Sequence, residues 1–185
     1  MTPTARRRIL KQEFFDRDTL VVARELVGKF LVRRYRGKEI ALMITETEAY
    51  DGPDDNASHA SRGKTERNVP MFGTAGRWYV YLCYGVHEML NIVTGDEGYP
   101  AAVLIRGGER YDGPGKVTKA LHVGRILNTK EAVEKTGLWI EDRGVIIPTK
   151  AIVALPRIGV AYAGDDWAKR PYRFHLARNW EKDVQ

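Results

Sequence analysis

The chain has 185 residues, of which 43% are hydrophobic and 29% charged, and this length suffices for one domain with a buried core. Thirty lysines and arginines against 24 acidic residues give a net charge of +6, which favours anionic partners but does not identify one. The single cysteine, Cys83, excludes an intramolecular disulfide and argues against a cysteine zinc site, so we expect a small buried side chain there.

The first strong pattern along the chain is a helix, with Asp16 or Asp18 as its N-cap and Gly28 as its stop. Five segments rich in β-branched and aromatic residues then predict strands, at residues 29–35, 39–50, 77–85, 88–95 and 101–109. Between the second and third of these lies a long polar segment, residues 51–76, with several glycines and prolines. In compact domains, segments of that length are usually functional or disordered.

The last third of the chain predicts three further elements: a loop leading into a helix at residues 113–127, a strand at 151–160 and a basic strand or arm at 168–180. The order of elements predicts an α+β fold. We expect a single domain over residues 1–185, with a basic N-terminal arm at about residues 1–12 and a curved, mostly antiparallel β-sheet surrounded by helices, from which a β-hairpin protrudes.

The sequence shows no apolar stretch as long as a membrane span, and its basic N-terminus lacks the long apolar segment of a secretory signal. We therefore expect an intracellular protein that does not enter a membrane.

The segment "ITETEAY" places ionisable groups in a strand that begins with the apolar run "IALM". Simple alternation puts Ile44, Glu46, Glu48 and Tyr50 on one face. Two solvated glutamates at a strand edge would be the ordinary explanation. A glutamate against an apolar wall would instead have a raised pKa and suit a general base. Carboxylates two residues apart on a strand also match the spacing of about 5 Å in retaining glycosidases, which is an alternative.

The segment "RWYVYLCYG" carries aromatic side chains into an expected turn. Tyr79 and Tyr81 share a face of the strand, and most strand tyrosines pack in a core. Tyr84 directly precedes Gly85, where we expect the chain to reverse as a hairpin. An exposed aromatic side chain at a hairpin tip fits a wedge between stacked bases.

Metal and nucleotide motifs are not evident. The four histidines show no metal-ligand spacing, so we expect no metal and no cofactor. "GPGKVTKAL" lacks the full spacing of a nucleoside triphosphate loop. A helix N-terminus beside Lys116 and Lys119 is still suited to a phosphodiester, although a surface helix with exposed lysines explains the pattern equally well.

Six blocks, in chain order, carry a specific resemblance: "TETEAYDGPDDNASHA", "RNVPMF", "YVYLCYG", "MLNIVT" with "AAVLIRGGE", "GPGKVTKAL" and "PRIGVAYAGDDWAKRPYRF". Together they resemble the alkyladenine (3-methyladenine) DNA glycosylase family over roughly residues 12–178. The resemblance implies a monomeric enzyme of the cytoplasm and nucleoid, or of the nucleus in a eukaryote. Its partner would be double-stranded DNA with damaged purines such as 3-methyladenine, 7-methylguanine, hypoxanthine and ethenoadenine.

The same resemblance implies the reaction and the role of each site residue. The damaged nucleotide would be flipped out of the duplex and its N-glycosidic bond hydrolysed, without lyase activity because no lysine matches a Schiff-base nucleophile. The implied roles are Glu48 as general base; Arg106 and the Ile158 carbonyl near the catalytic water; Tyr50, His59 and Tyr81 lining the base pocket; Asn91 crowding the 2-amino group of guanine; and Tyr84 filling the gap in the duplex. Glu46 would have a supporting role.

Two other functions compete with this hypothesis. One is a non-catalytic DNA- or RNA-binding module that uses only the basic surface and Tyr84, and the presence of Glu48 with the whole pocket set argues against it. The other is a carbohydrate glycosidase that uses Glu46 and Glu48. The basic charge, His59 and the wedge tyrosine argue against that second alternative.

Overall fold

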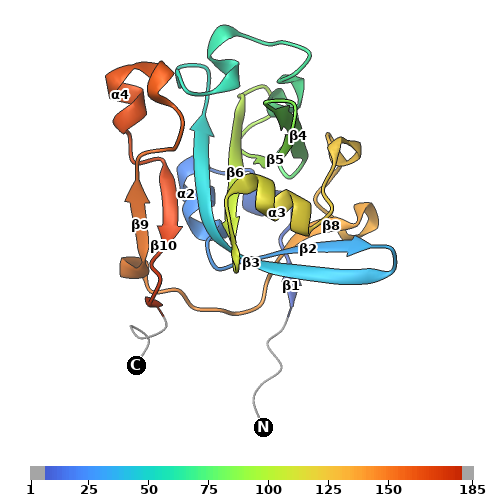
Figure 1. Ribbon diagram of the computed structural model, residues 1–185. Helices are drawn as coiled ribbons and strands as arrows, with labels where there is room; N and C mark the ends of the chain where they lie inside the picture. The colour runs from blue at the N-terminus through green and yellow to red at the C-terminus, as the bar shows by residue number, and fades with distance from the viewer. Residues whose placement is uncertain (1–6, 181–185) are drawn as a thin grey trace.

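The computed structural model describes residues 7–180, and within them it is a single α+β domain (Figure 1). Its strands are β1 (Arg8–Ile9), β2 (Phe30–Tyr35), β3 (Lys38–Asp51), β4 (Trp78–Cys83), β5 (His87–Val93), β6 (Ala101–Gly108), β7 (Tyr111–Asp112), β8 (Leu138–Asp142), β9 (Ile152–Leu155) and β10 (Arg173–Leu176). Its α-helices are α1 (Gln12–Phe15), α2 (Thr19–Leu26), α3 (Pro114–Ala120) and α4 (Gly164–Lys169). Short 3₁₀ turns are η1 (His59–Arg62), η2 (Val69–Phe72), η3 (Arg125–Leu127), η4 (Glu134–Thr136), η5 (Thr149–Ala151) and η6 (Ala161–Ala163).

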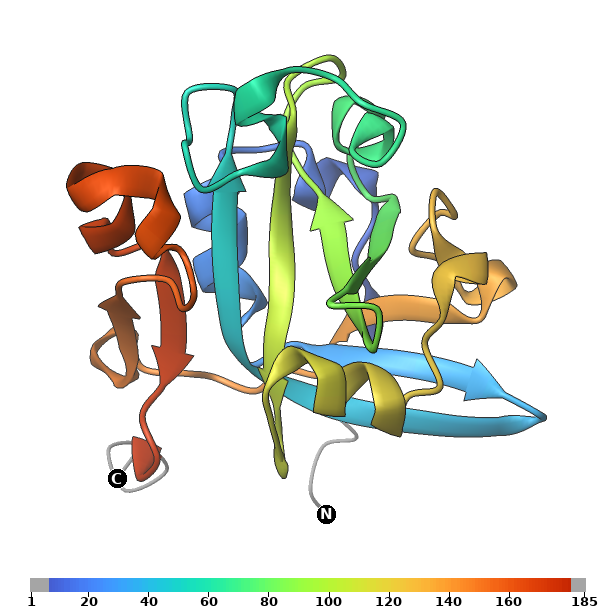
Figure 2. The same cartoon turned by 45° about the horizontal axis from the view of Figure 1, so that its top comes forward.

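One sheet contains all ten of these strands, in the order β1–β8–β2–β3–β6–β5–β4. Off this path, β10 and then β9 are added beside β3, and β7 pairs with β6. Every pairing between the described strands is antiparallel, which confirms the expected fold class. In Figures 1 and 2, α2 lies behind the sheet and α3 in front of it, while α4, β9 and β10 stand together at one side.

The long strand β3 belongs to both parts of the sheet, the part that contains β2 and β8 and the part that contains β6 and β10. Its first half pairs with β2, and its second half pairs with β6 and β10. The register against β6 shifts on both sides of Glu46, as in a β-bulge. Ile44 belongs to the main hydrophobic core, as does Ala49, whereas Glu46 and Glu48 do not. Because these register shifts interrupt strict alternation between Ile44 and Glu46, the common face expected for Ile44 and the glutamates stays a prediction.

Helix α2 forms as the sequence predicts, and its cap is Asp18. The Asp18 Oδ1 atom accepts a hydrogen bond of 2.9 Å from the Val21 N–H, which satisfies one of the free amides of the first turn. The helix ends at Leu26, and Gly28 follows with φ of +90°. Thr47 on β3 donates to the Ala23 carbonyl at 2.7 Å, so α2 is fixed against the strand that carries the glutamates.

Several segments differ from the sequence-based expectation; α1, β7 and α4, for example, were not expected. Strand β8 was not expected: the sequence predicts no element between residues 127 and 151, and the first four residues of "LWIED" are buried in the structure. The strand expected at residues 151–160 ends at Leu155, because Pro156 has no N–H for the ladder. Of the arm expected at residues 1–12, residues 1–6 lie outside the described part, and Arg8 and Ile9 form β1 against β8.

The polar segment between β3 and β4 is ordered by two buried side chains. The Asp55 carboxylate accepts hydrogen bonds from the backbone N–H groups of Asp51 and Ala57. Asn68 donates to the carbonyls of His59 and Gly63, at 3.0 and 2.8 Å. The segment therefore holds η1 and η2 in fixed positions over the end of the sheet.

Within residues 7–180, no helix has both the length and the apolar character needed to cross a membrane.

Candidate active site

Glu48 is completely buried, at 0% exposure, three residues before the end of β3. The Tyr50 hydroxyl donates to its Oε2 at 2.8 Å, and the backbone N–H of Ile158 donates to its Oε1 at 2.8 Å. Ile158 lies in the loop after β9, so two segments far apart in the sequence hold one carboxylate. The role that the resemblance implies for the Ile158 carbonyl, near the catalytic water, stays a prediction beside this contact of the N–H with Glu48.

Two arginines lie beside the glutamates. The Arg106 Nε atom is 3.6 Å from the Glu48 Oε1 and 3.4 Å from the Glu46 Oε1. Arg173 on β10 donates from NH1 to the same Glu46 oxygen at 2.7 Å. Glu46 is 5% exposed, so these four side chains form a largely buried charge cluster.

Opposing effects set the pKa of the Glu48 carboxyl. Burial raises the pKa of the Glu48 carboxyl, because a carboxylate loses hydration inside the protein, and the charge of Glu46 raises this pKa further. Arg106 and the hydrogen bonds from Ile158 and Tyr50 lower the same pKa and partly offset the burial. The balance leaves the pKa of Glu48 above that of a free glutamate.

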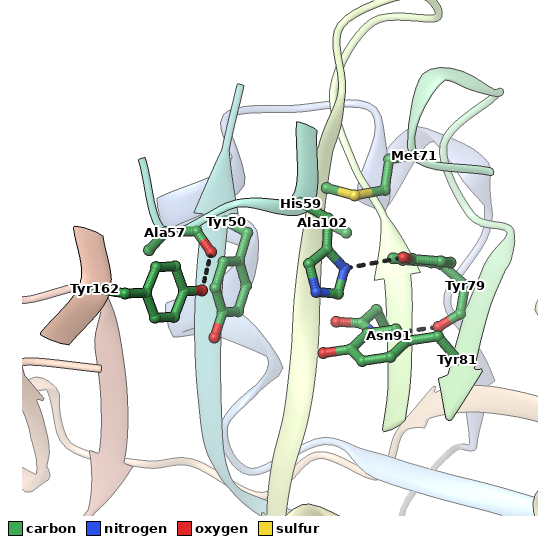
Figure 3. Close-up of a pocket in the computed structure, with 9 residues that line it drawn as sticks. All are labelled: Tyr50, Ala57, His59, Met71, Tyr79, Tyr81, Asn91, Ala102 and Tyr162. Carbon is green, nitrogen blue, oxygen red and sulfur yellow. Dashed lines mark hydrogen bonds between the residues drawn. The ribbon is translucent and has the colours of Figure 1, made fainter. Parts of the chain in front are cut away.

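A pocket opens beside Tyr50 and encloses about 340 Å³ of empty space, part of it open to solvent. It is lined by Tyr50, Ala57, His59, Met71, Tyr79, Tyr81, Asn91, Ala102 and Tyr162. Figure 3 shows Tyr50 and Tyr162 on one side, and His59 with Tyr81 on the other. The walls are mostly aromatic, with a few polar atoms, as in sites that bind flat organic ligands.

The aromatic side chains of one wall hold each other in place. The His59 Nδ1 lies 3.0 Å from the Tyr79 hydroxyl, and the His59 and Tyr81 rings meet edge to face, with centroids 4.6 Å apart. Burial lowers the pKa of His59, and the nearby charge of Arg67 lowers it further. Burial also raises the pKa of Tyr79 to about 12. Near neutral pH these two groups are therefore uncharged, which suits the binding of an uncharged or cationic ring.

Asn91 lies on β5 at the bottom of this wall and is 3% exposed. Its Nδ2 donates to the Tyr79 carbonyl at 3.1 Å, a bond drawn in Figure 3. This bond fixes the position of the Asn91 amide. A ligand too bulky to fit beside the amide could enter only if the bond broke.

A buried ion pair joins the segment after β3 to the loop after β9, on the side of the pocket where Tyr50 and Tyr162 lie. Arg157 forms a two-point ion pair with Asp55, in which NH2 is 2.8 Å from the Asp55 Oδ1, and both side chains are 0% exposed. Arg157 also donates to the Ala49 carbonyl, and its guanidinium lies 4.8 Å from the centre of the Tyr50 ring. The pair therefore fixes the Tyr50 ring and the neighbouring Ile158 together.

The β4–β5 hairpin carries Tyr84 at its tip. Tyr84 is 94% exposed and, with Gly85, has positive φ values of +50° and +69°. A non-glycine residue rarely adopts that conformation, so the turn presents this side chain at some cost in strain. Cys83, expected to be buried, ends β4 and is only partly buried.

The remaining predicted residues lie on α3, which packs against β5 near the tip of the hairpin. A Cβ at Gly115 would lie 2.9 Å from a ring nitrogen of His87, the first residue of β5. Lys116 and Lys119 are exposed on this helix. Among residues 7–180, no three His, Cys, Asp or Glu side chains are grouped so as to hold a metal ion.

Several site residues were missed by sequence reasoning. Tyr162 donates to the Ala57 carbonyl at 2.8 Å and closes the pocket beside Tyr50. Met71 and Tyr79 also line the pocket. For Tyr79 the sequence predicted only that it shares a face of its strand with Tyr81. Asp55 and Tyr162 both lie in blocks that carry the family resemblance, and their position there was the available signal.

Comparison with known proteins gives one consistent result. A family model described as "Methylpurine-DNA glycosylase (MPG)" matches residues 13–112 and 109–180. A protein of Methanocella arvoryzae is 46% identical, with 90% of this chain and 92% of that protein aligned. Proteins of Anaeromyxobacter dehalogenans strain 2CP-1 (47% identical; 90% and 81% aligned) and Nitrosococcus oceani (40%; 92% and 91%) are also similar. All three are named "Putative 3-methyladenine DNA glycosylase".

Proposed function

The chain belongs to the methylpurine-DNA glycosylase family, and from this membership and the site geometry we propose that it removes alkylated or deaminated purines from duplex DNA. The reaction is hydrolysis of the N-glycosidic bond, which leaves an abasic site, as the first step of base excision repair. The observation that carries the proposal is the buried Glu48 carboxylate, fixed by two hydrogen bonds beside an aromatic pocket.

Glu48 acts as the general base. Water is a poor nucleophile, and a carboxylate that takes its proton as C1′ gains positive charge both activates the water and stabilises the cationic sugar. The raised pKa of Glu48 makes the carboxylate more basic. Arg106 lowers this pKa and so favours the ionised form. We assign Arg106 and the Ile158 carbonyl to holding the attacking water.

The pocket receives the flipped base between Tyr50 and the wall formed by His59 and Tyr81. A methylated purine is cationic, and a cation over an aromatic face gains about 0.5–2 kcal/mol. A neutral lesion binds by stacking alone, and its extrusion costs less where damage has weakened its pairing. Asn91, fixed by its bond to Tyr79, crowds the 2-amino group of guanine and excludes that normal base.

We assign the hairpin and α3 to DNA contact. Tyr84 replaces the flipped base in the stack, and Lys116 and Lys119 bind the phosphate backbone beside the hairpin. None of the residues that line the described pocket is a lysine, which supports a monofunctional enzyme that acts through water.

Replacing Tyr84 by alanine is expected to slow excision roughly tenfold or more, since base–aromatic stacking contributes about 1–3 kcal/mol. The loss should be greater for well-paired lesions than for mismatched ones, because the wedge offsets the cost of opening a pair. Single-turnover rates of excision, measured on one duplex with a well-paired lesion and one with a mismatched lesion, give the two losses. Ile146→Ala, which truncates another exposed apolar side chain, is the matched control. Equal losses on both duplexes would contradict the wedge role.

The pH dependence of excision follows from the raised pKa of Glu48. The base must be ionised, so the rate should fall as the pH is lowered through this raised pKa. The acidic limb of the pH–rate profile should therefore lie nearer to neutral pH than the limb that a free glutamate would give. Single-turnover rates between about pH 4 and 8 would define the limb. The same limb in a His59→Gln variant assigns it to Glu48, whereas its disappearance would assign it to His59.

The proposal is tested by the bases that the protein releases. Methylated duplex DNA is incubated with the purified protein and a chelator, and free bases are separated by chromatography. Release of 3-methyladenine or 7-methylguanine by the wild type and not by Glu48→Gln is the expected result. Binding to damaged duplex without release of any base would favour the binding module instead.

A carbohydrate glycosidase with paired carboxylates fits this site less well. Glu46 is engaged by Arg173 at 2.7 Å, whereas a nucleophile or acid must face the substrate. The aromatic pocket lies beside Tyr50, two residues beyond Glu48, and gives no such role to Glu46.

A further inference from the structure

Glu46 and Glu48 share a single guanidinium. The Arg106 Nε lies 3.4 Å from the Glu46 carboxylate and 3.6 Å from the Glu48 carboxylate, so it is nearly equidistant from the two. This Nε is buried and has no hydrogen-bond partner among the described residues. A buried donor left between two acceptors indicates that Arg106 is held in place by both carboxylates together.

The chain makes specific room for Glu46. The β3 register shifts on both sides of this residue, and Gly107 faces it across the ladder. A Cβ at Gly107 would lie 2.9 Å from the Glu46 Cβ, so only glycine fits there without a shift. Glu46 in turn fixes Arg173, whose Nε donates to the Pro156 carbonyl at 2.7 Å, two residues before the Ile158 N–H that binds Glu48.

The cluster balances its charges, with two carboxylates against the guanidiniums of Arg106 and Arg173. The charged or titratable groups that face it are Tyr50 on β3, Tyr162 on η6, His175 (whose backbone pairs with that of Glu46) and Arg157, which is neutralised in its pair with Asp55. Removing the charge of Glu46 would therefore leave one uncompensated positive charge beside Glu48.

We propose that Glu46 is a positioning residue that divides Arg106 between two carboxylates and so keeps Glu48 available as a base. This inference rests on the proposed glycosylase activity. Without the Glu46 charge, Arg106 would pair fully with Glu48 and make it a weaker base. The net positive charge would also oppose the cation that develops at C1′.

The test is the pH–rate profile of single-turnover hypoxanthine excision by wild type, Glu46→Gln, Glu46→Asp and Arg173→Gln. In Glu46→Gln the acidic limb should move to lower pH by on the order of one unit, and the plateau should fall about tenfold. Glu46→Asp keeps the charge and should return the limb toward the wild-type pH. Arg173→Gln removes a positive charge and should move the limb in the opposite direction, to higher pH.

Glu141→Gln is the matched control, because Glu141 is also buried and paired with an arginine, Arg143, but lies on β8 outside the site. It should change stability and leave the limb in place. A lower plateau in Glu46→Gln with an unmoved limb would make Glu46 merely structural and overturn the inference, while the proposed function would stand. If Glu46→Gln does not fold, an unmoved limb in Arg173→Gln overturns it equally. No excision by the wild type would overturn both.

Discussion

Glu48→Gln is expected to lower the single-turnover rate of excision by about 10²–10⁴-fold, the usual contribution of a general base. Glutamine keeps the shape of the side chain and can still accept the Ile158 N–H, but it cannot take a proton from water. Affinity for a damaged duplex should change little, because Glu48 is buried below the pocket and no DNA contact is assigned to it. Excision and fluorescence anisotropy, measured on one duplex, separate the two quantities.

The same variant should fold at least as stably as the wild type. The raised pKa of Glu48 means that folding disfavours its ionised form, so a neutral amide removes a penalty that applies at neutral pH. A melting temperature equal to or above that of the wild type would agree with a residue kept for catalysis at the expense of stability. A large fall in melting temperature, with loss of binding, would instead make Glu48 a structural residue.

Asp55→Ala is expected to destabilise the domain by about 3–5 kcal/mol, because it leaves the Arg157 guanidinium buried without its partner. In a domain of this size, each kcal/mol lowers the melting temperature by roughly 2–4 °C, so a fall of about 6–20 °C should be measured by calorimetry. Asp54→Ala, at the exposed neighbouring aspartate, is the control and should change stability by less than about 0.5 kcal/mol.

Replacing both partners tests the cause of that effect. Asp55→Leu combined with Arg157→Met removes the stranded charge, and part of the lost stability should return. Excision should remain low even so, because Arg157 also holds the Tyr50 ring and the loop that carries Ile158. A melting temperature of Asp55→Ala equal to that of Asp54→Ala would show that the pair contributes nothing.

Local patterns in the sequence predicted those parts of the fold that depend on neighbouring residues. The Asp18 cap and Gly28 stop defined α2, and β-branched runs defined β2 to β6. Alternation correctly placed Glu48 and Tyr50 together, and they share a hydrogen bond of 2.8 Å. It did not reveal the register shifts on either side of Glu46, because a bulge depends on the partner strand and leaves no mark in the strand's own pattern.

The parts that sequence reasoning missed depend on contacts between distant segments. Asp55 and Arg157 are 102 residues apart; the first lies in the long polar segment and the second in the strand expected at residues 151–160, and no local pattern links them. The hydrogen bond from Ile158 to Glu48 spans 110 residues. Only the family resemblance pointed to Ile158, since no local spacing indicates which backbone group will meet a buried carboxylate.

The central claim is that Glu48-activated water releases a damaged purine from DNA. Its most direct test is a duplex with one hypoxanthine, incubated without metal and analysed with and without alkali. The claim predicts strand cleavage by the wild type only after alkali, and none by Glu48→Gln under either condition. Equal cleavage by both proteins would contradict the role of Glu48. Cleavage without alkali would contradict a monofunctional enzyme that acts through water.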